Sequence, residues 1–184
     1  MAELGWAAME WPGTEHVIVT QGAAGFRADS ALILADGELA RVAYRLQCGA
    51  DWRFVRLDVT VTRQSGTSRL SLTRDGDGRW LAGDEPLPAL GQCVDIDINR
   101  TPLTNTLPIR RLSWSPGTAY DLDVAYISLP ELDIRPSRQR YTMLWRDDST
   151  SEATYRYESG SYQADLPVDA DGYVKDYPGL WRRL

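Results

Sequence analysis

The sequence predicts an all-β, or nearly all-β, fold: a curved antiparallel sheet that forms a half-barrel or open barrel from about ten or more strands, with at most short helices. Three observations favour this class. Apolar and polar residues alternate with a period of two along most of the chain, turn-forming residues separate the alternating segments, and helical periodicity is scarce. Because sheets with one polar face twist and commonly curl, we expect a curved sheet and not a flat layer.

The clearest strand is predicted over residues 55–62, where apolar residues at every second position place one face inward and the other in water. These are Val55, Leu57, Val59 and Val61. The same alternation predicts strands around residues 42–48, 70–72, 94–98 and 120–126, and with aromatic residues around 141–145, 155–157 and 162–164.

Turn signals separate these segments and favour hairpin connections. They include the Asp-Gly cluster at 75–78, Ser-Pro-Gly at 115–117, Ser-Gly at 159–160 and Asp-Gly at 171–172. Only two stretches, residues 129–136 and 179–184, are expected to form a helical turn or two. We find no linker or repeat, so residues 1–184 are expected to form one domain.

Composition excludes several functional classes. The 184 residues carry 20 Lys and Arg against 26 Asp and Glu, a net charge of −6, which disfavours nucleic-acid binding. No apolar run is long enough to span a bilayer, and the first residues lack the features of a secretory signal. With only two cysteines, a disulfide framework or thiolate zinc site is not expected, and reduced thiols in the cytoplasm are the default interpretation. We predict neither a cofactor nor a metal site.

The segment after residue 94 carries the most specific chemistry. If residues 94–98 form a strand, Asp95, Asp97 and Asn99 share one face at spacings of about 6.5 to 7 Å. Such a row of oxygen atoms could be a general acid and base pair of the kind glycosidases use, or a set of hard ligands for calcium or magnesium. The third alternative is a solvated strand face that pairs with neighbouring arginines.

The residues that follow predict a rigid loop. Pro102 and Pro108 fix backbone angles, and the Thr and Asn side chains between them can bond nearby amides. If residues 109–114 are extended, Arg110 and Arg111 point to opposite faces. One of them then faces the core and needs a carboxylate, for which Asp95 or Asp97 is a natural partner.

Three segments carry a resemblance to a known family. They are DIDINRTPLTNTLPIRRL at 95–112, QRYT at 139–142 and DADGYVKDYPGLWR at 169–182. They resemble the hallmark of a bacterial family of uncharacterised proteins designated putative glycolipid-binding, and the similarity covers essentially the whole chain. Leu103 departs from the pattern, which has Phe there. The resemblance implies a half-barrel similar to that of lipoprotein carriers, which shelter an acyl chain on the concave side.

The favoured hypothesis is therefore a non-catalytic protein that binds a glycolipid or another amphiphile on the apolar concave face, with polar groups at the mouth. The candidate ligand-binding residues are Asp95, Asp97, Asn99, Asn105, Arg110, Arg111, Gln139, Tyr141, Tyr177 and Trp181. No catalytic residue is assigned. Two alternatives stay open: an enzyme that acts on a sugar-like substrate through Asp95 and Asp97, and a structural protein that forms a homodimer through its strand edges.

Overall fold

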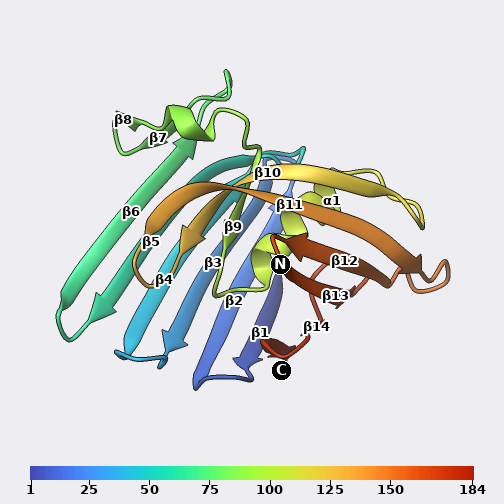
Figure 1. Cartoon of the computed structure of the whole chain (residues 1–184), viewed down its shortest axis with the longest axis horizontal. Coiled ribbons are helices and arrows are strands. Elements are labelled where there is room, and N and C mark those ends of the chain that lie inside the picture. Colours follow the sequence, from blue (N-terminus) through green and yellow to red (C-terminus); the bar gives the residue numbers. More distant parts are fainter.

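The computed structural model describes all of residues 1–184 and contains two sheets. The larger sheet has ten strands in the order β14-β15-β1-β2-β3-β4-β5-β6-β7-β8, and its two end strands do not pair with each other (Figure 1). Its strands are β1 (Ala2–Ala8), β2 (Gly13–Gly22), β3 (Gly25–Leu34), β4 (Ala40–Cys48), β5 (Phe54–Arg63), β6 (Gly66–Arg74), β7 (Trp80–Ala82), β8 (Glu85–Pro86), β14 (Asp176–Tyr177) and β15 (Trp181–Arg183). The sheet is thus open and antiparallel, as predicted.

The second sheet has the order β13-β12-β11-β10-β9 and crosses the larger one (Figure 1). Its strands are β9 (Asp95–Ile98), β10 (Ala119–Ser128), β11 (Asp133–Arg146), β12 (Ala153–Ser159) and β13 (Tyr162–Val168). All neighbours pair antiparallel except β9 and β10, which are parallel. A parallel pair needs a long crossover connection, and residues 99–118 supply it.

That crossover contains the α-helix of the fold and corrects one prediction. After η1 (Pro88–Leu90), the 3-10 turn η2 (Leu103–Asn105) runs into α1 (Thr106–Arg111), where the sequence predicted a loop followed by an extended segment. Pro108 is compatible with this helix because it lies in the first turn, where its missing N–H would have had no partner. No helix has the length and apolar composition needed to cross a bilayer.

The two predicted helical turns are also wrong. Residues 129–132 form a turn and β11 begins at Asp133, while β15 occupies residues 181–183 of the C-terminal segment. There, Trp181 and its two successors pair with β1, which gives the backbone of that strand hydrogen-bonding partners on its second side.

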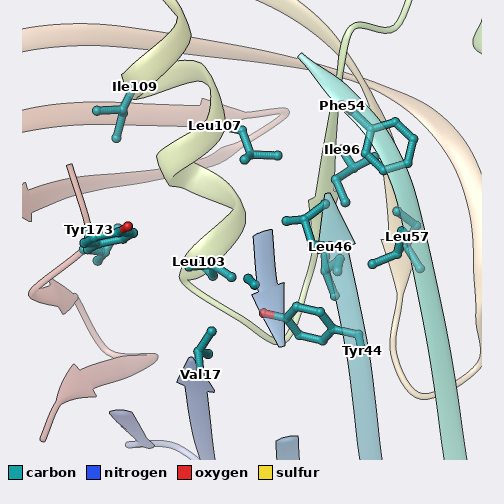
Figure 2. Packing of buried hydrophobic residues seen from close by; sticks show 14 of the residues in the cluster. Val17, Tyr44, Leu46, Phe54, Leu57, Ile96, Leu103, Leu107, Ile109 and Tyr173 are labelled. Atoms are coloured by element: carbon teal, nitrogen blue, oxygen red, sulfur yellow. The ribbon is translucent and has the colours of Figure 1, made fainter. Parts of the chain in front are cut away.

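The concave side of the large sheet is filled by the protein itself. The alternation predicted for β4 is observed, and so is that of β5 from Leu57 to Val61, and the inward residues of both stretches are buried. Val55, which was predicted to face inward, is 43% exposed, because the pairing with β4 shifts between Gln47 and Cys48 and Phe54 takes the inward position. Figure 2 shows Leu103 and Leu107 of the η2–α1 segment gathered with Ile96 of β9 against Leu46 and Phe54 of the large sheet. These residues belong to a buried apolar cluster of 42 side chains that both sheets share. An acyl chain therefore has no open trough on this face, which corrects the expected location of the ligand.

Candidate functional site

A cleft of about 280 Å³ opens where the end of the second sheet meets the C-terminal strands. Strands β13 and β14 contact each other there, and both lie near the C-terminus in Figure 1. Among the predicted residues, five line this cleft: Asp97, Asn99, Asn105, Tyr177 and Trp181. The sheets thus bring together residues that are up to 84 positions apart in the sequence, counted from 97 to 181.

Asp97 provides the carboxyl group of the cleft. Its Oδ1 accepts a hydrogen bond from Thr104 Oγ1 at 3.0 Å, and its Oδ2 accepts one from Gln139 Nε2 at 2.7 Å. The hydroxyl of Tyr157 approaches Oδ2 at 3.4 Å. Burial raises the pKa of Asp97 above its ordinary value, because removal from water penalises the charge more than these hydrogen bonds compensate.

Aromatic rings surround this carboxyl group. The ring of Tyr157 lies 5.2 Å from that of Tyr141 and 6.3 Å from that of Tyr177, in both cases edge to face. Tyr162 extends the wall, 6.3 Å from Tyr177, and Trp181 packs edge-on against Trp11. Burial raises the pKa values of Tyr157 and Tyr177 well above the usual range for tyrosine, so both hydroxyls are neutral at physiological pH.

Two asparagines hold the irregular backbone around the cleft. Asn99 Oδ1 accepts a hydrogen bond from the backbone N–H of Leu129 at 2.8 Å, which ties the end of β9 to the end of β10. Asn105 donates from Nδ2 to the carbonyl of Pro102 and accepts from the hydroxyl of Tyr141 at 2.8 Å. Tyr141, like Gln139, is buried directly behind the cleft and positions residues that line it.

Asp95 and Arg111 form a separate ion pair. Asp95 is 1% exposed, and Arg111 donates to it from Nε at 3.0 Å and from Nη2 at 2.6 Å. The predicted pairing of an arginine with one of the two aspartates is thus observed, although the arginine comes from a helix and not from a strand. Neither residue is among those that line the cleft.

Arg110 lies in another cleft, beside the C-terminal end of α1. The ten predicted residues therefore divide into five that line the first cleft, two that support it, one ion pair and one residue elsewhere. Because residues 106–111 form a helix, Arg110 and Arg111 do not line the first cleft, where the sequence analysis placed them.

The first cleft has the chemistry to bind a hydroxylated molecule. A carboxylate offers about four acceptor sites, and Asp97 uses two in short hydrogen bonds and a third in the longer contact with Tyr157. One acceptor position on Oδ1 is left for a ligand. Asp97 is the only acidic residue among those that line the cleft, so the acid and base pair of a glycosidase is not assembled there.

Sequence reasoning missed several lining residues: Thr101, Tyr126, Arg135, Tyr157, Ser159, Tyr162 and Leu180. Tyr157 and Tyr162 were recognised only as members of alternating strands. Arg135 lies over the ring of Tyr126, with its guanidinium carbon 4.4 Å from the ring centre. Alternation indicates which strand face a tyrosine occupies, but pairing of β13 with the C-terminal segment decides which rings meet.

Comparisons with known proteins agree with the resemblance seen in the sequence. A comparison with curated proteins gives no match. Among solved structures, the chain is similar to the crystal structure of a DUF1089 family protein from Pseudomonas aeruginosa, with 40% sequence identity and a TM-score of 0.81. That similarity covers 92% of each chain. The family model described as "Putative glycolipid-binding" matches residues 3–183. The chain therefore belongs to this family.

Proposed function

We propose that the protein binds the hydroxylated head group of a glycolipid or related amphiphile in the cleft around Asp97, without catalysing a reaction. The observation that supports this most directly is a buried carboxyl group with a remaining acceptor position inside an aromatic wall. Sugar rings present hydroxyl donors at their edges and C–H groups on their faces. The first suit a carboxylate and the second suit tyrosine and tryptophan rings.

The size of the cleft favours a head group over an acyl chain. Its volume of about 280 Å³ lies just below the usual range of ligand sites, roughly 300 to 1,000 Å³. Since the concave face of the large sheet is filled, the apolar part of the ligand must lie outside the cleft. Leu180 lines the mouth, and its carbonyl accepts a hydrogen bond from the backbone of Met9, whose side chain is exposed. Leu180 and Met9 therefore form an apolar surface next to the head-group site.

The test compares octyl β-glucoside with octanol, which has the same chain and no sugar, by isothermal titration calorimetry below the micellar concentration. We expect octyl β-glucoside to bind and octanol to bind much more weakly. Asp97→Asn should weaken octyl β-glucoside binding about tenfold, because a hydrogen bond to a charged acceptor contributes about 1.5 kcal/mol or more.

The matched control is Asp84→Asn, which removes an exposed carboxylate from the turn between β7 and β8. It should leave affinity unchanged. The proposal is wrong if Asp97→Asn and Asp84→Asn bind octyl β-glucoside equally well. It is also wrong if the purified protein carries no lipid by native mass spectrometry and octyl β-glucoside leaves its melting temperature unchanged.

A further inference from the structure

A second cleft, of about 380 Å³, lies between the end of α1, the ends of β11–β13 and the loop at residues 169–172. Two arginines line it, Arg110 and Arg146, and neither has a carboxylate within 4.0 Å, the limit for an ion pair. In a chain with a net charge of −6, two unpaired cations in one concave site form a local positive region.

Packing holds Arg110 in place without using its hydrogen-bond donors. Its guanidinium carbon lies 5.1 Å from the ring centre of Trp52, so one face of the group is covered by an aromatic ring. Its aliphatic stem packs against Gly172, where a Cβ atom would come within 3.1 Å of Arg110 Cδ. Because this contact and the ring fix the side chain, its N–H groups require little ordering before they bind an anion.

The one acidic residue in the lining does not compete for the arginines. Asp169 accepts a hydrogen bond from Arg183 Nη1 at 2.9 Å and two more from the backbone N–H groups of Asp171 and Tyr173. Its charge is therefore balanced by Arg183, a cation that does not line the cleft. The two remaining arginines carry the net charge of the site.

The opposite wall is aromatic and neutral. Trp114 donates from Nε1 to the carbonyl of Ile109 at 3.0 Å and packs edge-on against Tyr155, with the ring centres 5.0 Å apart. Burial raises the pKa of Tyr155 to about 12, with Arg146 as the opposing influence, so its hydroxyl keeps its proton and can donate to a ligand. This wall suits an organic group attached to the anion.

We propose that this second cleft binds a phosphate or carboxylate group carried on an organic ligand, with Arg110 and Arg146 as its charged donors and Trp114 as the surface for the organic part. Arginine matches such oxyanions because its planar group donates two parallel hydrogen bonds. The site is independent of the cleft around Asp97, whose lining shares no residue with it.

Calorimetric titration of the whole protein with phenyl phosphate and with inorganic phosphate tests this proposal. We expect phenyl phosphate to bind more tightly than inorganic phosphate, because only the former reaches the aromatic wall, and both to weaken with added salt. Arg110→Gln should weaken phenyl phosphate binding at least about tenfold, and Arg146→Gln, which changes an exposed side chain and leaves the core intact, should weaken it several-fold.

The matched control is Arg41→Gln, which removes an exposed arginine that also lacks an ion-pair partner, from the outer face of β4. It should bind phenyl phosphate as the unmodified protein does. Equal affinity of Arg146→Gln and Arg41→Gln, or no binding of phenyl phosphate at millimolar concentration, overturns the proposal. Vesicles of phosphatidylcholine with and without phosphatidic acid identify the source: selective binding of the anionic vesicles indicates a lipid head group, and binding of phenyl phosphate alone indicates a soluble ligand.

Discussion

Glu15 lies on the inward face of β2, the same face as the apolar residues Val17 and Val19, and is 1% exposed. Its Oε1 accepts hydrogen bonds from Ser30 Oγ at 2.8 Å and from the Tyr44 hydroxyl at 2.7 Å, and its Oε2 lies 2.6 Å from Thr101 Oγ1. Burial raises the pKa of Glu15 from its ordinary value of 4.5 to about 7, and the three hydrogen bonds only partly oppose this shift.

This raised pKa makes stability depend on pH. Between pH 4.5 and about 7 the folded protein holds a proton on Glu15 that the unfolded chain has released, so the free energy of unfolding falls as pH rises through this window. Below pH 4.5 the contribution is fully present, and above pH 7 it is lost. A shift of this size corresponds to about 3 kcal/mol, a large fraction of the roughly 5 to 15 kcal/mol that stabilises a typical domain.

The substitution Glu15→Gln tests the assignment, because glutamine has nearly the same shape and resembles the protonated acid. Its amide can donate to Thr101 Oγ1 while its carbonyl accepts from Ser30 and Tyr44. We expect the variant to match the unmodified protein at pH 4.5 and to be more stable by about 3 kcal/mol at pH 8. Urea unfolding at several pH values, followed by tryptophan fluorescence, measures this difference.

Comparison of the two proteins at each pH cancels the contributions of all other titrating groups, including Asp97. Glu85→Gln, which removes an exposed carboxylate without an ion-pair partner from β8, controls for the lost charge. The reasoning is refuted if the difference in unfolding free energy between Glu15→Gln and the unmodified protein stays constant from pH 4.5 to 8.

Three further perturbations follow from the packing. Replacing Asp95 by Asn should cost about 3 to 5 kcal/mol in urea unfolding, because it leaves Arg111 without its buried partner, whereas the double replacement Asp95→Leu with Arg111→Met should recover most of this loss. Equal losses of unfolding free energy for Asp95→Asn and for the double variant would contradict this reasoning. Gly25→Ala should lower stability by at least about 2 kcal/mol, since the φ angle is +117° and the added Cβ would lie 2.2 Å from the carbonyl oxygen of Cys48; an unchanged urea midpoint would contradict it. Burial raises the pKa of the Cys93 thiol to about 11 and that of Cys48 further, so both should react with a thiol reagent only after unfolding, and rapid labelling of the native protein would show otherwise.

The alternation of apolar and polar residues predicted most strands correctly. The helix in the crossover was not predicted, because the effect of a proline depends on its position in the helix. The alternation in β4, and in β5 from Leu57 onward, depends only on which face of each strand is buried, so it is visible in the sequence. Val55 was predicted to face inward and does not, because the register shift opposite it is not a local pattern. The helix at Thr106–Arg111 was missed because Pro108 suggested a break, although a proline in the first turn is compatible with a helix. The extended backbone predicted for residues 109–114 was wrong for the same reason, although Arg111 still pairs with Asp95.

Part of the candidate site could be predicted from the alternation within a single strand. Asp97 and Asn99 belong to one strand, so their shared position could be inferred from the period of two. Tyr157, Tyr162 and Trp181 line one cleft only because β13 contacts β14 and β15 pairs with β1, and no local pattern specifies those contacts. Glu15 was likewise not singled out, since the residue that completes its hydrogen bonds, Thr101, is 86 positions away.

By itself, the sequence determined the β architecture, the turns and the family, because each depends on residue types at short and fixed spacings. Only the tertiary structure decided whether the concave face stays open. A period of two specifies which side chains point inward, but not what covers them. Here η2, α1 and the second sheet cover them, and the two clefts in which we propose ligand binding lie at the margins of this buried cluster.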